Sequence, residues 1–431
     1  MLRQGQDQSV RFSRRRLLGG TAAAAAALAA TSAGGAASPI GAPRLLKYAK
    51  QADQPIKIGV ISPLSGAWTV YGTAHSQGFE LAVDEINANG GVLGRQIEIV
   101  LADSQTEPRI VVEQANRLIR EEKVDLIAGT FSSAERNAAG PVINAAEKIL
   151  LYPTFYEGQS QEFFPGVCNK LIFMFGPVPS QQVNPHMEYM TDTYGKNFYM
   201  VGSDYVWPRE TNARVKEALA NIGGSVVGED YIPFNTSEYD SVLRKIRDSG
   251  ADIVFGTLTG TDTVNFARQF YGAGMNDEFT YWTVDDEEFA TKGKGPEASA
   301  GTYVSFDYFM AIETPENQSF LERLRAKYGA DAGTNTVGVA MYNAAHMFAL
   351  AAEKAGSLET DQLIAALEGI EFTGPQGPVQ MRAEDHQMVL PSYLVEVNEG
   401  WTSFDDMFTI VQSTGLVEPA ASACTLPLTS G

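Results

Sequence analysis

The chain has 431 residues, of which 44% are hydrophobic and 19% charged, a balance typical of a packed globular protein with room for two domains. Asp and Glu number 52 against 32 Lys and Arg, so the formal net charge is −20 at pH 7. Such acidity argues against nucleic acid and anionic membrane surfaces as partners. It does not identify a ligand, because acidic surfaces are also a common route to solubility.

Residues 1–42 are predicted to be a twin-arginine signal peptide and leader. The segment Ser13-Arg14-Arg15-Arg16-Leu17-Leu18 is followed by an Ala-rich apolar stretch over residues 21–31, which is too short to cross a bilayer. The alternative is a basic N-terminus beside a fortuitous alanine run. No later apolar run approaches the ~20 residues of a transmembrane helix, and no Cys for a lipid anchor directly follows the signal. We therefore expect a soluble, untethered protein in the periplasm.

The two cysteines, Cys168 and Cys424, would lie in an oxidising compartment, where a disulfide is permitted. A bond between them would tie the C-terminal tail, which contains Pro and Ser, to the middle of the chain. The alternative is two separate buried thiols. Neither cysteine has a CxxC neighbour or metal-ligand spacing, so no redox or zinc role is expected.

From residue 55 to residue 152, apolar strands alternate with amphipathic helices. The first helix carries Phe79, Ala82, Val83 and Ile86 at i, i+3, i+4 and i+7 and ends at Asn89-Gly90-Gly91, where glycine permits a left-handed cap. This alternation is typical of a parallel sheet covered by helices on both faces. The predicted strands are 56–61, 97–102, 124–128 and 149–152, and the later helices are 109–120 and 134–147.

The same pattern starts again after a Pro-rich link at residues 175–179. The predicted strands of this second set are 197–201, 225–231, 252–256 and 280–284, and its helices are 209–221, 239–248 and 264–273. A strand at 303–308, a helix within 337–354 and a sheet segment at 392–398 follow. Because a doubly wound sheet usually needs about five strands, we expect these late elements to complete both halves. The fold class is therefore α/β with two lobes.

Ligands of doubly wound sheets bind at the carboxyl ends of the strands, so the cleft between two such lobes is the expected site. The loops that should line this cleft are 62–71, 129–133, 152–158, 203–209, 257–261 and 283–288.

Several of these loops carry recognisable motifs. Residues 89–95, Asn-Gly-Gly-Val-Leu-Gly-Arg, resemble an early motif of periplasmic binding proteins of the branched-chain amino-acid and amide type. Four further segments resemble those of the urea and short-chain amide receptors in that superfamily, in the same order along the chain. They are Tyr152-Pro153-Thr154-Phe155-Tyr156-Glu157-Gly158, Pro177-Val178-Pro179-Ser180-Gln181-Gln182, Gly202-Ser203-Asp204-Tyr205-Val206-Trp207-Pro208-Arg209-Glu210 and Pro375-Gln376-Gly377-Pro378-Val379.

The resemblance covers residues 56–398 and implies a type I periplasmic binding protein fold. In that fold, two doubly wound Rossmann-like lobes are joined by three crossover strands, here expected near residues 176, 302 and 386. Lobe I would comprise 55–176 plus 303–385, and lobe II 177–302 plus 386–431. The implied function is that of an extracytoplasmic receptor of an ABC importer, which binds urea or a short-chain amide and delivers it to permease membrane subunits. No cofactor, metal or nucleic acid is implied.

The resemblance also implies ligand-binding residues. Ser133 would hydrogen-bond the ligand amide, beside an aromatic wall at Phe131. Tyr152 and Thr154 would come from the Tyr-Pro-Thr motif, and the second lobe would contribute Tyr205 and Thr259. A flat amide or urea needs hydroxyl groups around its plane and aromatic faces above and below it, and these residue types supply both.

Asp285 departs from the urea receptors, which carry a small residue near this position. A carboxylate that faces the cleft would suit a guanidinium-type or other donor-rich ligand, whereas the alternative is a carboxylate solvated outside the pocket. A branched-chain amino acid also stays open as a ligand, because a helix N-terminus near Ser133 would suit its carboxylate. Glu157 and Arg209 are either a structural pair or ligand contacts.

A protein of another class, an exported amide hydrolase, would need a nucleophile with a base, or a metal site. The sequence has no GxSxG, P-loop, SxxK or HExxH pattern, and its four histidines are scattered. We therefore expect a binding protein and not an enzyme.

Overall fold

The computed structural model describes residues 54–66, 68–158 and 169–420. The predicted signal peptide and leader and both cysteines lie outside the described residues, so the export signal and the Cys168–Cys424 bond stay predictions. In the described part of the chain, no helix combines the length and the apolar character needed to cross a membrane.

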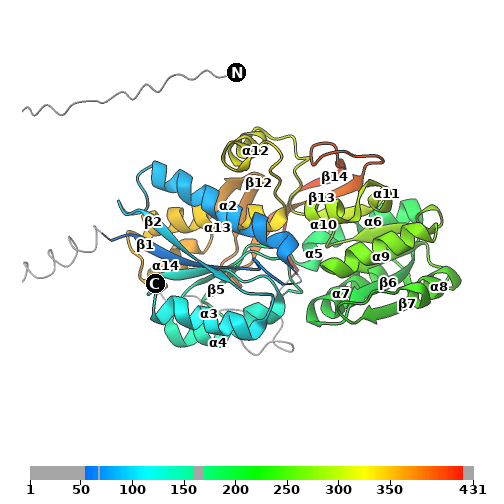
Figure 1. Ribbon diagram of the computed structural model, residues 1–431, viewed down its shortest axis with the longest axis horizontal. Coiled ribbons are helices and arrows are strands. Elements are labelled where there is room, and N and C mark those ends of the chain that lie inside the picture. The colour runs from blue at the N-terminus through cyan, green and yellow to red at the C-terminus, as the bar shows by residue number, and fades with distance from the viewer. Residues whose placement is uncertain (1–53, 67, 159–168, 421–431) are drawn as a thin grey trace, which may run out of the picture. The chain divides into compact units, whose positions relative to one another are not determined.

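The N-terminal lobe alternates strands and helices as predicted. Its elements are β1 (Ile56–Ser62), α2 (Thr69–Ala88), β2 (Ile97–Asp103), α3 (Pro108–Arg120), β3 (Leu126–Gly129), α4 (Ser133–Ala146), β4 (Leu150–Tyr152) and β5 (Ile172–Met174). Within the described residues they form a five-stranded parallel sheet in the order β2-β1-β3-β4-β5. The strands β3, β4 and β5 are buried throughout, as expected where helices cover both faces. The helices α3 and α4 lie on one face of this sheet and α2 lies on the other (Figure 1).

The second lobe repeats this strand order. Its elements are α5 (Pro179–Gln182), α6 (Asn184–Tyr194), β6 (Asn197–Ser203), α7 (Val206–Asn221), β7 (Ser225–Ile232), α8 (Asp240–Asp248), β8 (Ile253–Thr257), α9 (Thr261–Gly272), a 3-10 helix η1 (Met275–Asp277), β9 (Thr280–Thr283), α10 (Glu288–Lys294), α11 (Pro296–Ser299) and β10 (Tyr303–Phe306). The strands β7-β6-β8-β9-β10 are neighbours in that order and all run parallel. Both lobes are therefore doubly wound, with strand order reversing between β1 and β3 in one and between β6 and β8 in the other.

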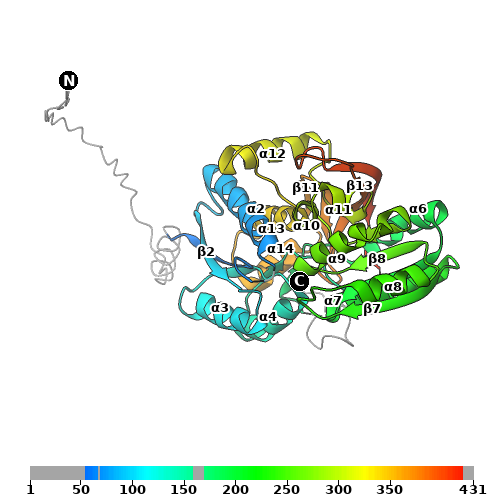
Figure 2. The same ribbon diagram turned by 45° about the vertical axis from the view of Figure 1, so that its right-hand side comes forward.

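The rest of the chain completes both lobes. Its elements are α12 (Pro315–Tyr328), α13 (Thr336–Ala355), α14 (Thr360–Leu367), β11 (Glu371–Gly374), β12 (Gly377–Met381), β13 (Met388–Val397) and β14 (Phe408–Val417). The helix α13 lies beside α2 of the first lobe (Figures 1 and 2). The strand β13 pairs antiparallel with β10 and carries β12 and β14 beside it, and β11 pairs with β12. These four strands extend the second sheet to nine strands in the described part of the chain.

The chain crosses between the lobes after β5, after β10 and before β13. The predicted division places β10 in lobe I, but its hydrogen bonds to β9 and β13 lie in the second sheet. The physical reason is that β9 offers an open edge for parallel pairing, and the chain leaving α11 meets this edge before it returns to the first sheet. The lobe boundaries as a whole stay a prediction.

Apolar side chains alternate between the two faces of the second sheet. Tyr199, Val201 and Val254 face a cluster formed with α8 and α9. Phe198 and Met200, one residue away, face the larger core that includes α6 and α7. The two-residue repeat of a strand thus gives each face its own helix layer.

Candidate ligand-binding cleft

A sharp turn leads from β3 into α4 at the carboxyl edge of the first sheet. Gly129 and Thr130 both have positive φ, and a Cβ on Gly129 would lie 2.3 Å from the backbone oxygen of Ile61. Ser132 then caps α4, because its hydroxyl accepts from the backbone N–H of Glu135 at 3.2 Å. The Glu135 carboxylate accepts in return from the N–H groups of Phe131 (2.7 Å) and Ser132 (3.1 Å). These two amides at the helix N-terminus are therefore bound by the chain's own carboxylate.

Ser133, the next residue, belongs to a buried chain of polar groups. Its hydroxyl donates to Glu157 Oε2 at 2.5 Å, and Glu157 Oε1 pairs with Arg136 at 2.8 Å. The Arg136 guanidinium lies 4.9 Å from the ring centre of Tyr152 and 4.8 Å from that of Tyr156, at distances where a cation is attracted to aromatic faces.

The suggested pairing of Glu157 with Arg209 is wrong. Arg209 pairs with Asp204 at 2.6 Å on the surface, whereas Glu157 pairs with Arg136 in the interior. Arg136 lies one turn into α4, so only the tertiary fold brings it to the loop after β4.

Tyr152 and Thr154 follow β4 at the same edge of the sheet. The Tyr152 hydroxyl donates to the backbone oxygen of Phe131 at 2.9 Å, and burial raises its pKa above the usual range. Thr154 is 2% exposed, and its Oγ1 has no hydrogen-bond partner among the described residues. Its hydroxyl is thus a buried polar group that is available to a ligand.

The second lobe places Tyr205, Thr259 and Asp285 after β6, β8 and β9. Asp285 is 1% exposed and therefore is not solvated outside the cleft. Its Oδ2 accepts from the hydroxyl of Tyr71, a residue of α2 in the first lobe, at 3.4 Å, while Oδ1 has no partner in the described part of the chain. Burial raises the pKa of Asp285 well above its usual range, and the charges of Asp286 and Glu287 raise it further.

The predicted residues are linked to one another across the lobes. Burial and then the charge of Asp285 raise the pKa of Tyr205, and Tyr152 and Glu157 of the first lobe act on the same hydroxyl. Thr259, whose buried Oγ1 has no hydrogen-bond partner among the described residues, lies near Tyr205, and Phe131 contacts Tyr152 through its carbonyl. Thr154 stands two residues beyond Tyr152. The structure therefore gathers these residues at the facing carboxyl edges of the two sheets.

Aromatic rings that sequence reasoning did not single out lie beside the predicted residues and contact one another. Tyr71 stacks on Phe131 with ring centres 4.7 Å apart and planes at 21°. Trp68 of the first lobe approaches Phe234 of the second at 6.2 Å, and Phe155 approaches Trp207 at 5.2 Å. Most of these rings lie in the predicted cleft loops, which is the signal that would have found them. Phe234 follows β7, outside any predicted loop.

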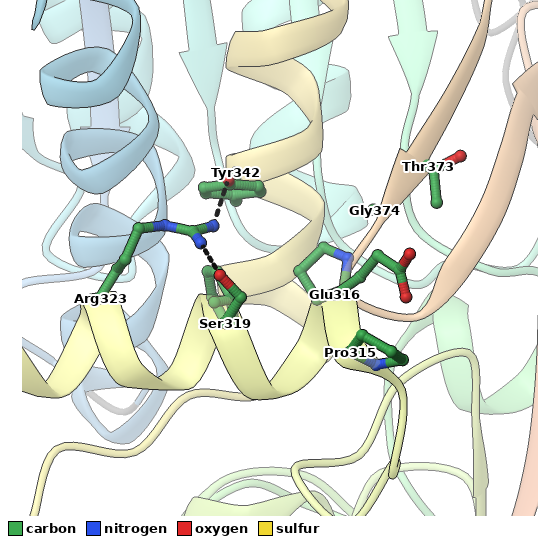
Figure 3. A pocket seen from close by; sticks show the side chains of 9 residues that line it. Pro315, Glu316, Ser319, Arg323, Tyr342, Thr373 and Gly374 are labelled. Carbon is green, nitrogen blue, oxygen red and sulfur yellow. Dashed lines mark hydrogen bonds between the residues drawn. The ribbon is translucent and has the colours of Figure 1, made fainter.

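A cavity of about 330 Å³ lies elsewhere, between α12, α13 and β11 (Figure 3). Its one arginine, Arg323, donates to Tyr342 at 3.1 Å and to Ser319 at 2.5 Å and pairs with Glu85 at 2.7 Å. The cation is thus neutralised by the chain itself, and none of the predicted ligand residues lines this cavity. Among residues 54–66, 68–158 and 169–420, no group of His, Cys, Asp and Glu is arranged to hold a metal ion.

Comparison with known proteins gives the family. Residues 55–402 match the model of a family described as periplasmic binding protein. The Leu/Ile/Val-binding protein homolog 6 of Brucella melitensis is 25% identical over 349 residues, which are 79% of this chain and 87% of that protein. An ABC transporter substrate-binding protein from Sphaerobacter thermophilus superposes with a TM-score of 0.75 at 26% identity and covers 84% of this chain and 98% of its own. A solute binding protein of an ABC transporter from R. palustris, solved with benzoate, shares the fold, with a TM-score of 0.75, 23% identity and coverage of 86% and 100%. The chain belongs to the periplasmic binding protein family and has the two-lobed type I fold.

Proposed function

We propose that this chain is the solute-binding protein of an ABC importer and carries urea or a short-chain amide to membrane permease subunits. The family, the predicted export signal and the names of the similar proteins support the transport role. The proposed ligand contacts are Ser133 and Thr154 from the first lobe and Tyr205, Thr259 and Asp285 from the second, with Phe131 and Tyr152 as aromatic walls. Hinge closure of the lobes would bury the ligand and create the form that the permease recognises.

The single observation that carries this ligand class is the buried Oδ1 of Asp285, which has no partner in the described structure. A buried acceptor without a donor costs about 1–3 kcal/mol. An N–H group of a ligand would remove that cost, whereas a carboxylate or ether oxygen would add repulsion. The site therefore favours a ligand that presents N–H donors to the second lobe.

The first lobe argues against a ligand that carries a carboxylate. Such a group would seek the N-terminus of α4 or a free cation. Glu135 already occupies the N–H groups of Phe131 and Ser132, and Arg136 pairs with Glu157. A branched-chain amino acid or benzoate, which the names of similar proteins mention, would have to compete with Glu135 for those two N–H groups and with Glu157 for the guanidinium, because both anion sites already hold a carboxylate of the chain. Urea and amides need no anion site.

A guanidinium-type compound is the second candidate, and Asp285 favours it. A cation opposite Asp285 would compensate the buried carboxylate and would lie among the rings of Tyr71, Phe131 and Tyr205. Because the pKa of Asp285 is raised in the empty cleft, a cation would drive a proton off this group. Urea is neutral and would leave the proton in place, with its N–H group on the carboxyl oxygen that lacks the proton.

Calorimetric titration of the protein lacking residues 1–42 tests the proposal. The probes are urea, acetamide, formamide, guanidine, leucine and benzoate at matched pH, each in two buffers of different ionisation enthalpy. We expect urea or an amide to bind with the same enthalpy in both buffers. Preference for guanidine with proton release would select the second candidate, and preference for leucine or benzoate would contradict both. Steady release of ammonia from amides would instead indicate the hydrolase.

Two variants test the contacts in the same titration. Asp285→Asn keeps the shape of the side chain but replaces one of the two carboxyl oxygens with an NH₂ group and removes the negative charge. It should therefore weaken guanidine binding far more than urea binding. Ser133→Ala should lower the affinity for urea by about 1–3 kcal/mol, because a ligand N–H would be left unpaired. Unchanged affinity in either variant would remove that residue from the proposed site. Lys170→Met, on an exposed surface pair with Asp361, serves as the control.

A further inference from the structure

The neighbours of Ser133 decide whether its hydroxyl group donates a hydrogen bond to a ligand or accepts one. A serine hydroxyl carries one hydrogen and two lone pairs, and a carboxylate only accepts. Ser133 donates to Glu157 at 2.5 Å, and both side chains are buried. The hydrogen is thus committed to Glu157, so the Ser133 oxygen has only lone pairs left for a ligand.

Arg136 keeps Glu157 in the role of an acceptor. Its guanidinium pairs with Oε1 at 2.8 Å, and both side chains are almost fully buried, at 1% and 2% exposure. The rings of Tyr152 and Tyr156 lie beside the guanidinium at 4.9 and 4.8 Å and hold it in place. A protonated Glu157 would leave this cation unbalanced in the interior, which is costly. The carboxylate is therefore ionised and orients the Ser133 hydrogen toward itself.

Tyr152 has the same polarity. Its hydroxyl hydrogen goes to the backbone oxygen of Phe131 at 2.9 Å, and its oxygen adjoins Ser133. Two neighbouring hydroxyl groups on the first lobe are thus turned so that they accept hydrogen bonds and do not donate them.

We infer that Glu157 is a positioning residue that commits the Ser133 hydrogen and so makes the first-lobe wall of the cleft select for N–H donors. This inference rests on the proposed function, because it assumes that the cleft is the ligand site. Asp285 offers an acceptor on the opposite lobe. A ligand that satisfies both walls carries N–H groups on two edges, as urea and guanidinium do. Acetamide carries N–H groups on one edge and acetate carries none. Urea, acetamide and acetate are nearly isosteric, so together with guanidinium they form a graded set of probes.

The variant Glu157→Gln tests the inference. The Arg136 guanidinium would donate to the amide oxygen of the new glutamine, and this would turn the NH₂ group of the glutamine toward Ser133. That group would donate to the Ser133 oxygen and free the hydroxyl hydrogen to point at the ligand. We expect the affinity for urea to fall at least about tenfold and the preference for urea over acetate to shrink by a similar factor.

A double-variant cycle separates positioning from a general structural role. In the Ser133→Ala background, Glu157→Gln should change urea affinity by less than about twofold, because no hydroxyl is left to reorient. Equal weakening of urea and acetamide, with the same loss in both backgrounds, would overturn the inference. The control is Glu85→Gln, because Glu85 also pairs with an arginine, Arg323 at 2.7 Å, and accepts from a tyrosine hydroxyl, Tyr342 at 2.7 Å, outside the cleft. It should leave all affinities unchanged.

The same experiment distinguishes failure of the proposed function. If leucine is the probe that binds, the ligand class is wrong, but the cycle run with leucine still reports whether Glu157 acts through Ser133. If no probe binds, the thermal melting points of the four proteins of the cycle are compared, and additivity of the two substitutions would overturn the inference. Where Glu157→Gln does not fold, the double variant Arg136→Met, Glu157→Gln removes both charges together and replaces it in the cycle.

Discussion

At the scale of single residues, four consecutive acids after β9 have different roles. Asp286 pairs with Lys294 and accepts from the Thr263 hydroxyl at 2.8 Å. Glu287 caps α10, and Glu288 accepts from the backbone of Met310 at 2.6 Å. Both oxygens of Asp286 and of Glu287 have partners, Glu288 has one for Oε1 but none for Oε2 among the described residues, and Asp285 faces Tyr71 of the first lobe. Sequence alone cannot separate them, because neighbouring residues of one type differ here only in their tertiary partners.

The buried pair of Lys294 and Asp286 gives a prediction for stability. Both side chains are 1% exposed, so Lys294→Met leaves a buried carboxylate beside Asp285 and Glu287 without its cation. We expect the free energy of unfolding to fall by about 3–5 kcal/mol, measured by thermal or chemical denaturation. The exposed pair variant Lys170→Met should cost less than about 1 kcal/mol, and equal losses in the two variants would contradict the argument.

At the scale of elements, two helices from distant parts of the sequence approach closely through glycine. A Cβ on Gly78 of α2 would lie 1.9 Å from the backbone oxygen of Gly338 in α13, and a Cβ on Gly338 would lie 2.9 Å from that of Ala74. This crossing seats α13 against the first lobe after the chain has returned from the second (Figure 2). Close backbone approach requires the absence of a side chain, which explains glycine inside a helix despite its low propensity.

Gly78→Ala should therefore destabilise the protein. The added methyl group has no space unless α2 and α13 separate, and overpacking of this kind costs about 1–3 kcal/mol. Gly272→Ala is the matched control, because a Cβ at that exposed end of α9 meets nothing within 4 Å. Differential scanning calorimetry should show a lower melting temperature for the first variant alone. An unchanged value would mean that the two helices are free to shift.

At the scale of the whole molecule, buried acids join the lobes where α13 of the first lobe meets the second. Asp307 accepts from the Thr336 hydroxyl at 2.5 Å, and Glu287 lies near Asn335 at the start of the same helix. Burial raises the pKa of Glu287 from 4.5 to about 7 and that of Asp307 from 3.8 to about 7. In the folded protein both groups thus hold protons that the unfolded chain would release.

The sign of the pH dependence follows from linkage. Because the folded state binds these protons more tightly, their contribution to stability is complete below pH ~4 and is lost as the pH rises through about 7. Melting temperatures measured from pH 5 to 8 should fall with a slope that Glu287→Gln and Asp307→Asn both reduce. Glu85→Gln should leave this slope unchanged, since the pKa of Glu85 is lowered to about 2 and its effect lies at acid pH. An equal slope in all variants would contradict the assignment.

The sequence determined the alternation of strands and helices, the parallel doubly wound class and the family. Predicted segments such as 109–120 and 280–284 agree closely with α3 and β9, because burial on one or both faces imposes a period that is visible within about ten residues. The motif residues at strand ends were also predictable, since parallel strands all end at one edge. Urea or amide specificity stays a proposal.

Only the tertiary structure decided which distant groups meet. It joined Glu157 to Arg136 and not to Arg209, buried Asp285 against Tyr71, and placed β10 in the second sheet. The strands β5, β11, β12 and β14 also escaped prediction, because each is held by hydrogen bonds to a neighbouring strand and not by its own pattern. Local periodicity depends on residues that are close in sequence, whereas charge pairing and strand order depend on contacts that exist only after the lobes have folded.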